Sequence, residues 1–314
     1  MEMLKNNAFS TKTPYLQLVW DSTSLNLLKT CAYKYYLSMI EQWSSKHQAV
    51  PLSFGIAYHA ALESYDKARA EGLDYDAATI AAVRKALEKS GTRNPDGSFT
   101  PWADSSNTRN RYTLCRAVVW YLEQFKNDSV KTVILSNGKP AVELSYRYGT
   151  GHFTAEGEEF ELSGHLDRVV EFDNQRFIQD RKSTEQTITP KFFEKFSPDN
   201  QMSGYSLAGK VVFGIDTAGV MIDACQTAVS FTRFERGFAS RTSAQLSEWF
   251  DDAMVWLKIA ELYAVQQHWP MNDAACTLYG GCQFRPMCRK DPAVREVFLE
   301  SNFEKKVWDP TEAR

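Results

Sequence analysis

Hydrophobic and polar residues alternate along residues 166–172 and again along 176–179, with Asp173 and Asn174 between the two runs. Such alternation is typical of a β-strand, and Asp and Asn tolerate the positive φ that a tight hairpin turn needs. The pattern therefore predicts a β-hairpin. In this hairpin Asp167 would lie directly opposite Asp180, and Lys182 would share their face because side chains alternate along a strand.

Helical spacing of apolar residues predicts helices over much of the remaining chain. The predicted helices cover residues 25–39, 53–70, 74–89, 108–125, 200–212 and 243–267, with a short one at 190–196. Strand-like patterns cover residues 141–148, 159–172, 176–182 and 228–234. Residues 91–107 are polar and rich in Gly, Pro and Ser, so we expect a disordered or substrate-facing loop. This order of helices, central sheet and helices predicts an α/β fold.

Composition narrows the classes of function. The chain has 314 residues, of which 43% are hydrophobic, and a net charge of −3. This charge argues against a protein that coats nucleic acid by bulk positive charge, although an acidic catalytic centre is compatible with it. The first residues lack the apolar core of a signal peptide, and no apolar run approaches the roughly 20 residues of a membrane span. We therefore expect a soluble, cytoplasmic protein without a membrane partner.

The predicted hairpin carries the first candidate chemistry. Asp167 and Asp180 would place two carboxylates face to face, with the ammonium group of Lys182 beside them. Oxygen ligands of this kind suit Mg²⁺ or Mn²⁺, and a neighbouring lysine can help to activate water or hold a phosphate. The alternative is a solvated Asp/Lys pair on a surface hairpin.

Cysteines form the second candidate site. Cys276, Cys282 and Cys288 are evenly spaced in a segment interrupted by Gly and Pro, and Cys31 in the first predicted helix is the natural fourth thiolate. Four thiolates fit either a tetrahedral Zn²⁺ or a 4Fe–4S cluster. Three unrelated free cysteines are the simpler alternative. Cys115 and Cys225 lie in apolar stretches and are expected to be ordinary core residues.

Six motifs follow one another in an order that resembles a known family. They are the segment 24–37 around Cys31, Phe54-Gly-x-x-x-His59, Gly164-x-x-Asp167-Arg, Asp180-x-Lys182, Gln201-x-x-x-Tyr205, and the three late cysteines. Over about residues 22–289 the chain resembles a RecB-type member of the PD-(D/E)XK nuclease superfamily. More narrowly, it is similar to the iron–sulfur nucleases, which include AddB and the CRISPR-associated exonucleases.

The resemblance implies a fold and a domain organisation. The expected core is restriction-endonuclease-like, with a mixed central β-sheet flanked by helices. N- and C-terminal helical segments would be joined by the cysteine-ligated cluster. In this organisation residues 1–20 are an arm, residues 21–290 form a single nuclease domain with its iron–sulfur staple, and residues 291–314 are a tail.

The resemblance also implies roles for individual residues. His59, Asp167, Asp180 and the main-chain carbonyl of Arg181 would bind Mg²⁺ or Mn²⁺. Lys182 would position or deprotonate the attacking water and steady the scissile phosphate. Gln201 and Tyr205, one helical turn apart, would reach into the site. A 4Fe–4S cluster, favoured over zinc, would be held by Cys31, Cys276, Cys282 and Cys288.

The function implied by the resemblance is metal-dependent hydrolysis of DNA by a bacterial, archaeal or phage-encoded enzyme. The expected activity is that of a single-stranded DNA exonuclease, with 5′ to 3′ polarity carried over from the family, in repair, recombination, phage biology or CRISPR adaptation. The chain has no Gly-x4-Gly-Lys-Ser/Thr loop, so a helicase or another partner protein would supply any unwinding. Two alternatives remain: an endonuclease or processing subunit of a larger complex, and a non-catalytic nucleic-acid-binding protein.

Overall fold

The computed structural model describes residues 7–46, 49–102 and 106–312. These residues divide into two compact units. Unit 1 takes the described residues up to 46, residues 145–164, and those from 242 onward. Unit 2 takes the described residues between 49 and 144, together with residues 165–241.

Seven of the described strands pair into one mixed sheet, ordered β1-β7-β8-β9-β10, with β5 and β6 also pairing with β7. Parallel pairing joins β1 to β7 and β8 to β9, whereas β7–β8 and β9–β10 are antiparallel. The α/β fold with a mixed central sheet flanked by helices is thus confirmed. The strands are β1 (Val19–Trp20), β5 (Lys131–Thr132), β6 (Val142–Phe153), β7 (Glu159–Phe172), β8 (Gln175–Thr184), β9 (Gly219–Thr227) and β10 (Thr232–Ala239).

The β7–β8 hairpin has the register that its turn residues predict. Asp173 and Asn174 adopt φ values of 51° and 57°, as a two-residue hairpin turn requires. The ladder then pairs residues outward from Phe172 and Gln175 as far as Arg168 and Gln179. The next two positions are those of the two aspartates, so they face each other where the regular ladder stops.

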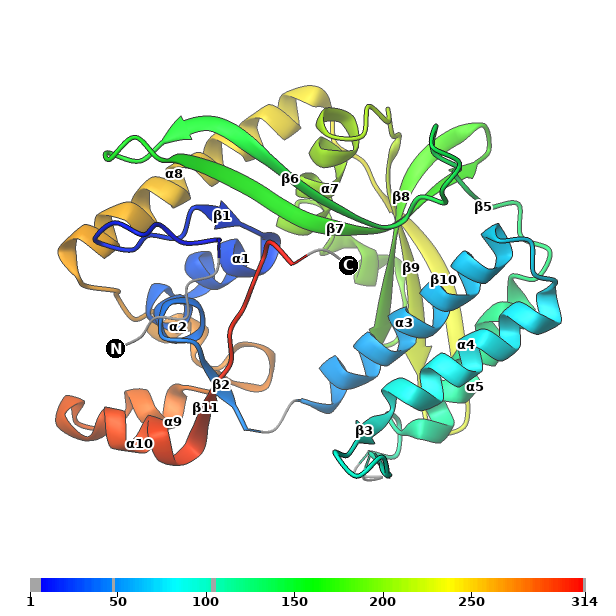
Figure 1. Cartoon of the computed structure of the whole chain (residues 1–314), viewed down its shortest axis with the longest axis horizontal. Helices are drawn as coiled ribbons and strands as arrows, with labels where there is room; N and C mark the ends of the chain where they lie inside the picture. The colour runs from blue at the N-terminus through cyan, green and yellow to red at the C-terminus, as the bar shows by residue number, and fades with distance from the viewer. Residues whose placement is uncertain (1–6, 47–48, 103–105, 313–314) are drawn as a thin grey trace. The chain divides into compact units, whose positions relative to one another are not determined.

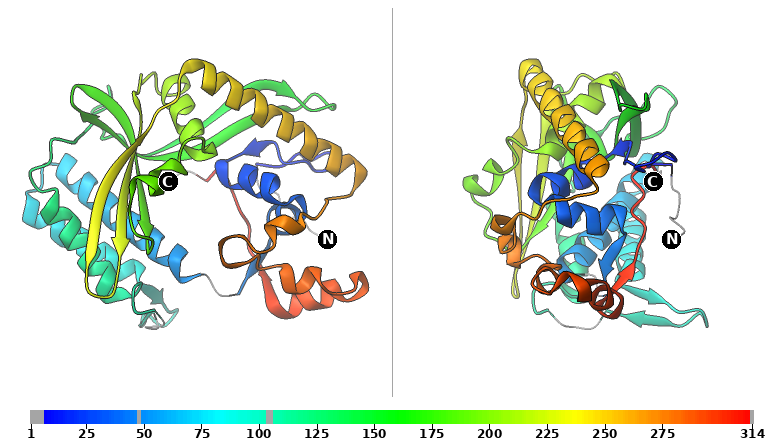
Figure 2. Two further views of the ribbon diagram at one scale, coloured as in Figure 1. Left: turned by 180° about the vertical axis from the view of Figure 1, so that it is seen from behind. Right: turned by 90° about the vertical axis from the view of Figure 1, so that its left-hand side faces the viewer.

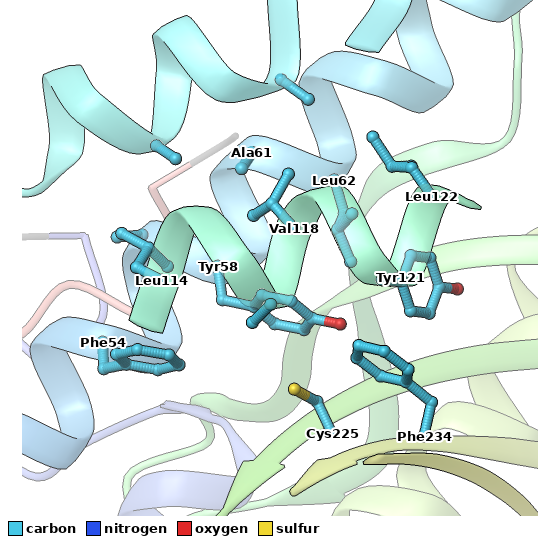
Figure 3. Close-up of a cluster of buried hydrophobic side chains, with 14 residues drawn as sticks. Phe54, Tyr58, Ala61, Leu62, Leu114, Val118, Tyr121, Leu122, Cys225 and Phe234 are labelled. Carbon is cyan, nitrogen blue, oxygen red and sulfur yellow. The ribbon is translucent and has the colours of Figure 1, made fainter. Parts of the chain in front are cut away.

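In unit 2 two helices, α3 (Val50–Ala70) and α5 (Arg111–Gln124), pack against one face of the sheet, and a third, α4 (Tyr75–Lys89), packs on these two helices. Tyr58 of α3 and Leu114 and Tyr121 of α5 meet Cys225 and Phe234 of the sheet in one hydrophobic core (Figure 3). A short hairpin of β3 (Gly91–Arg93) and β4 (Phe99–Pro101) separates α4 from α5.

The other face of the sheet in unit 2 contacts the helical segment that follows β8. This segment contains α6 (Pro190–Glu194) and α7 (Asn200–Val211), and α7 begins at the N-cap Asp199. Gly209 of α7 approaches Ile178 of β8, where an added Cβ would lie 3.2 Å from the isoleucine side chain. Residues 178, 180 and 182 alternate with residues 179 and 181 along β8, so the first set faces α7 and the second faces α3 and α5.

Unit 1 contains the segments nearest the two chain ends. Its helices are α1 (Ser22–Thr30), α2 (Ala32–Tyr35), the π-helical turn Tyr36–Ile40, α8 (Ser243–Gln266), α9 (Arg285–Cys288) and α10 (Arg295–Asn302), with 3₁₀ turns at Asp273–Ala275, Leu278–Gly280 and Pro292–Val294. Strand β2 (Trp43–Ser45) pairs antiparallel with β11 (Phe303–Lys305), a pairing that can be followed in Figure 1. Leu37 packs with Phe284, Met287, Leu299 and Phe303 in a second core. Early and late segments are therefore joined by strand pairing and hydrophobic contact.

Several predicted elements differ from the observed ones. The helix predicted over residues 25–39 is interrupted at Cys31, whose backbone is extended (φ −163°, ψ 111°). A contact from far along the chain accompanies this break, because Tyr33 N–H donates to Pro270 O at 3.0 Å. The break therefore has a tertiary component that helical periodicity does not contain. The loop predicted over residues 91–107 contains the β3–β4 hairpin, and its residues 103–105 lie outside the described part of the chain.

The strand predicted at residues 228–234 is wrong in position. Strand β9 ends at Thr227, β10 begins at Thr232, and the residues between them form the turn. All nine residues of β9 are buried, so its sequence shows no alternation; this is typical of strands covered on both faces. Figure 2 shows these strands from two further sides. No helix within the described residues is long and apolar enough to cross a membrane.

Candidate active site

Helix α3 contacts strands β7 and β8 at three points along one side. Gly55 approaches Ser183, with 3.7 Å between the serine Oγ and an added Cβ. His59 Nδ1 lies 3.2 Å from Asp167 Oδ2, and two turns later Asp66 pairs with Arg181. Residues seven positions apart share one side of a helix. One stripe of α3 therefore meets both strands of the hairpin.

The two facing aspartates occupy different surroundings. Asp167 Oδ2 accepts a hydrogen bond from the main-chain N–H of Arg181 at 3.1 Å, so a side chain replaces the ladder partner at this position. Asp180 Oδ1 accepts a hydrogen bond from Lys182 Nζ at 3.0 Å. Asp180 Oδ2 lies 2.8 Å from the same nitrogen but is buried and accepts no hydrogen bond.

Burial and neighbouring charges shift the pKa values of the two carboxyl groups in opposite directions. Burial raises the pKa of Asp180 to about 6, with the Asp167 charge adding to the rise and Lys182 opposing it. Burial would also raise the pKa of Asp167. There, however, His59, Lys182 and the Arg181 N–H together hold the pKa well below its ordinary value. Near neutral pH both groups are ionised, and the negative charge at Asp180 is the less favourable one.

Lys182 and, when it is protonated, His59 carry the positive charge of the site. Burial would lower the pKa of both groups, but the two aspartates outweigh it and raise each pKa above its ordinary value. Lys182 is therefore protonated in this arrangement, which suits a cation that holds a phosphate better than one that removes a proton. A further lysine, Lys195, is close enough for its pKa to be lowered by burial and by Lys182.

A chain of hydrogen bonds extends the site onto α7. Lys182 Nζ donates to Gln201 Oε1 at 2.8 Å, and Gln201 Nε2 donates to the Tyr205 hydroxyl at 2.7 Å. The first turn of α7 is fixed by Asp199, whose carboxylate accepts from the N–H groups of Gln201 and Met202. The structure thus brings Gln201 and Tyr205 together with the aspartates and the lysine.

The arrangement of these residues agrees with a protein-family model that matches most of the sequence. Residues 21–289 match the family model of the PD-(D/E)XK nuclease superfamily. The chain belongs to this superfamily. A search of curated proteins gave no match.

Two solved structures are similar to this PD-(D/E)XK chain. A candidate exonuclease from Eubacterium rectale is 11% identical, over 88% of this chain and 90% of its own, with a TM-score of 0.49. The protein SSO0001 is 8% identical, over 65% of this chain and 84% of its own, with a TM-score of 0.27. Neither similarity is strong enough to indicate an activity for this chain.

Nucleases of the PD-(D/E)XK superfamily typically use Mg²⁺ or Mn²⁺. Within the described residues, no three His, Cys, Asp or Glu side chains already converge as a metal site. The donor set nevertheless fits such an ion, because Asp180 Oδ2 is buried without a hydrogen bond and Asp167 lies opposite it. Carboxylate oxygens are the ligands that Mg²⁺ and Mn²⁺ prefer. His59 already contacts one of these carboxylates and could add a nitrogen ligand.

Sequence analysis missed a group of buried ions behind the PD-(D/E)XK strands. Asp66, which is only 3% exposed, pairs through Oδ1 with Arg168 Nη1 at 3.3 Å and through Oδ2 with Arg181 Nη2 at 2.7 Å. Arg168 also donates to Gln179 Oε1 at 3.1 Å. Asp66 thus anchors the residue whose main-chain N–H holds Asp167. The seven-residue spacing from His59 is the sequence signal that could have found it.

All four cysteines of the predicted cluster belong to unit 1, but within the described residues no three of them already converge as a metal site. Burial and three neighbouring thiols raise the pKa of Cys288 to about 11, with Arg295 opposing the rise. These thiols are those of Cys282, Cys31 and Cys276. All six cysteines of the chain are free thiols, and Cys225 lies in the core of unit 2.

Asn272, which sequence analysis also missed, connects two of these cysteines. Its main-chain N–H donates to Cys31 Sγ at 3.4 Å, and its carbonyl oxygen accepts from Cys276 Sγ at 3.8 Å. Its side chain donates to Thr30 O at 2.9 Å. The extended backbone at Cys31 places the sulfur within reach of this loop. The break in the predicted helix therefore coincides with the point where the early and late cysteines meet.

Proposed function

We propose that this protein is a metal-dependent DNA nuclease, and more narrowly a single-stranded DNA exonuclease with 5′ to 3′ polarity. The observation that carries the proposal is the Asp167, Asp180 and Lys182 group on β7 and β8, with one carboxylate oxygen buried and accepting no hydrogen bond. Membership of the PD-(D/E)XK superfamily supports nuclease activity and a DNA substrate. The 5′ to 3′ polarity and the preference for single-stranded DNA are carried over from the nucleases that the sequence resembles.

A divalent cation held by Asp167, Asp180, His59 and the Arg181 carbonyl would lower the pKa of a bound water and stabilise charge on the phosphoryl oxygens. The chain's own residues have separate tasks. His59 must lose its proton to ligate the ion, so binding of the ion is favoured at higher pH. Arg181 N–H keeps the Asp167 carboxylate in one orientation.

Lys182 acts as the cation for the phosphate. In the structure its ammonium group lies between Asp180 and Gln201, which hold it at 3.0 Å and 2.8 Å. With a divalent ion held at Asp180, the Lys182 ammonium group would be available to a phosphate oxygen. Gln201 keeps that nitrogen at the site, and Tyr205 fixes the orientation of the Gln201 amide.

We further propose that Cys31, Cys276, Cys282 and Cys288 hold a 4Fe–4S cluster. All four thiols belong to unit 1, and three of them contribute to the raised pKa of the fourth, Cys288, which supports this proposal. The main-chain N–H that donates to Cys31 Sγ also supports it, because hydrogen bonds to the sulfurs tune such clusters. Protein purified without oxygen should then be brown, with broad absorbance near ~400 nm, as expected of an iron–sulfur cluster. A colourless protein that contains stoichiometric zinc would replace this part of the proposal with a zinc site.

The first experiment is a time course on end-labelled single-stranded DNA with Mn²⁺, comparing wild type with Asp180→Ala. Asp216→Ala is a matched control, because it removes an exposed carboxylate from the same unit. We expect released mononucleotides with wild type and the control, and intact DNA with Asp180→Ala. Comparison of 5′-labelled and 3′-labelled strands gives the polarity.

A circular single-stranded substrate separates the alternatives. An exonuclease leaves the circle intact, whereas cleavage of the circle would replace the proposal with an endonuclease. If wild type leaves every substrate uncut but retards it on a gel, the protein binds nucleic acid without hydrolysing it and the catalytic proposal fails.

A further inference from the structure

Two adjoining pockets lie in unit 2 beyond the carboxylate site, and Arg111 lines both of them. The basic pocket, of about 550 Å³, is bordered by the end of α4, the β3–β4 hairpin and the start of α5. The amide pocket, of about 400 Å³, includes Trp102, Asn107 and Tyr112. Figures 1 and 2 show the end of α4 and the start of α5 at one end of their helical layer.

The basic pocket concentrates positive charge in a chain whose net charge is −3. Its lining includes four cations and one carboxylate: Arg84, Lys89, Arg93, Arg111 and Glu88. Glu88 is engaged by Lys85 at 3.3 Å. Within the described part of the chain, none of the four cations forms an ion pair. A site with this balance of charge attracts anions.

Arg111 is held in place before any ligand arrives. Its Nε donates to Ser90 Oγ at 3.0 Å, and its guanidinium carbon lies 5.5 Å from the centre of the Phe99 ring. A fixed guanidinium binds a phosphate with less loss of side-chain freedom than a mobile one. Arg111 is therefore a preorganised phosphate ligand at the junction of the two pockets.

The amide pocket has the features of a site for a base. The Tyr112 side chain is 74% exposed, which core packing does not explain. Arg116 lies 5.9 Å from the centre of the Tyr112 ring. Exposed aromatic rings give a base a surface for stacking, and stacking tolerates any sequence. Asn107, also exposed, offers a side-chain donor and acceptor at the same pocket.

A short segment connects these pockets to the catalytic strand. Glu185 follows Lys182 by three residues, just after the end of β8. It contacts the Thr108 hydroxyl and lies 3.9 Å from Arg109 Nε. Thr108 and Arg109 lie in the chain between Asn107 and Asn110, which both line the amide pocket. This wall of the pocket is therefore next to the end of the strand that carries Asp180 and Lys182.

We propose that the amide pocket and the basic pocket form a binding path for a single nucleic-acid strand that leaves the carboxylate site. Tyr112 and Asn107 take a base, and Arg84, Lys89, Arg93 and Arg111 take backbone phosphates. This inference rests on the proposed nuclease function, because it assigns the substrate's course beyond the bond that is cut.

The test measures binding of fluorescent single-stranded DNA of about 20 nucleotides, with Asp180→Ala as the parent to prevent cleavage. Arg84→Ala/Arg93→Ala is compared with Arg176→Ala/Lys210→Ala, which removes two exposed cations elsewhere in unit 2. We expect the path variant to bind about tenfold more weakly near 0.1 M salt. We also expect its slope of log affinity against log salt to fall by about 1.4, because each lost phosphate contact contributes about 0.7 for single strands. The control should match the parent.

Tyr112→Ala sharpens the assignment. Loss of one stacked base should weaken binding severalfold while leaving the salt slope unchanged, because stacking releases no counterions. In proteins that keep Asp180 and can therefore cleave DNA, the effect of the path variant should depend on the length of the oligonucleotide. Oligonucleotides of about 4 nucleotides, too short to reach the basic pocket, should be cut equally by wild type and Arg84→Ala/Arg93→Ala, whereas longer strands should show a raised KM only in the variant.

Each outcome separates this inference from the proposed function. If wild type cleaves DNA but the path variant binds like its parent, or if the control weakens binding equally, the path is wrong while the nuclease proposal stands. If wild type cuts nothing but binding depends on Arg84 and Arg93 as expected, the path is supported and the catalytic proposal fails. An unchanged melting temperature of the variants excludes misfolding as the cause of weaker binding.

Discussion

Asp167, Asp180 and Lys182 lie on two hydrogen-bonded strands, whereas Cys31, Cys276, Cys282 and Cys288 lie at helix ends and in short turns. The two aspartates are buried, and each contacts a partly exposed basic side chain: Asp180 contacts Lys182, and Asp167 contacts His59. The cysteines are partly exposed, and the described contacts of Cys31 and Cys276 are weak ones to Asn272.

The difference teaches where each group obtains its geometry. The sheet fixes the aspartates through its register, so the site is arranged before any ion binds. The positions of the cysteines depend on the extended backbone at Cys31 and on turns that neighbouring contacts stabilise. Contacts other than the cysteines also join the early and late segments of unit 1, because β2 pairs with β11 and Leu37 packs with Phe284 and Leu299.

The largest expected effect is on kcat, which should depend on the carboxylate site and not on the cysteine group. Asp167→Asn should lower kcat by about a thousandfold, because it removes a proposed metal ligand, and a bound metal ion contributes several kcal/mol of transition-state stabilisation. Cys276→Ser should leave kcat within a few-fold at low temperature. The measurement is the initial rate on labelled single-stranded DNA with Mn²⁺. Equal losses in the two variants would mean that the cysteine group takes part in catalysis.

The next effect concerns the ions behind the carboxylate site. Asp66→Ala should lower the free energy of unfolding by about 3 kcal/mol, because it leaves Arg181 and Arg168 buried without their carboxylate. Denaturant unfolding measures the change. Asp96→Ala, which removes an exposed carboxylate of the same unit, is the control. A loss no greater than that of the control would show that the buried ions are not needed to hold the strands.

A third effect depends on pH. The pKa of Asp180 is about 6 in the folded, metal-free protein, above the unfolded value of ~3.9. Its charge therefore destabilises the fold as pH rises through the window between these values. The free energy of unfolding of Asp180→Asn should equal that of wild type near pH 4 and exceed it by up to about 3 kcal/mol above pH 7. Urea unfolding in a chelator, repeated across pH, tests this. A constant difference would contradict the assigned pKa.

The smallest effect concerns the stability of the cysteine group in protein that lacks the proposed cluster. In cluster-free protein Cys276→Ser should change the free energy of unfolding by less than about 1 kcal/mol, since the thiol makes only a weak hydrogen bond. Leu299→Ala in the same unit should cost about 2–3 kcal/mol, because it opens a cavity in the core that joins the early and late segments. The reverse order would show that the thiols hold these segments together.

The hairpin could be predicted because turn chemistry and strand alternation agree. Asp173 and Asn174 set the turn, and the period of two then places Asp167 opposite Asp180. The motif order likewise located the α7 pair Gln201 and Tyr205. In each case the signal lies within a few residues or in a regular repeat.

What sequence analysis missed depends on contacts between distant residues. The break at Cys31 meets the loop of Asn272, more than two hundred residues later. Strand β9 has no alternation because both of its faces are covered. Asp66 is an ordinary helical aspartate in the sequence, and only the fold places it against Arg168 and Arg181.

The turn at Asp173 and Asn174 also limits how this hairpin can change during evolution. An insertion in one arm alone would shift the pairing by one residue and send one of the two acids to the wrong face, unless a bulge absorbed it. Matched insertions, one in each arm, keep Asp167 and Asp180 opposed. The number of residues between the two acids can therefore change only in steps of two. Among related sequences, the parity of that spacing becomes a simple arithmetic marker of an intact carboxylate pair.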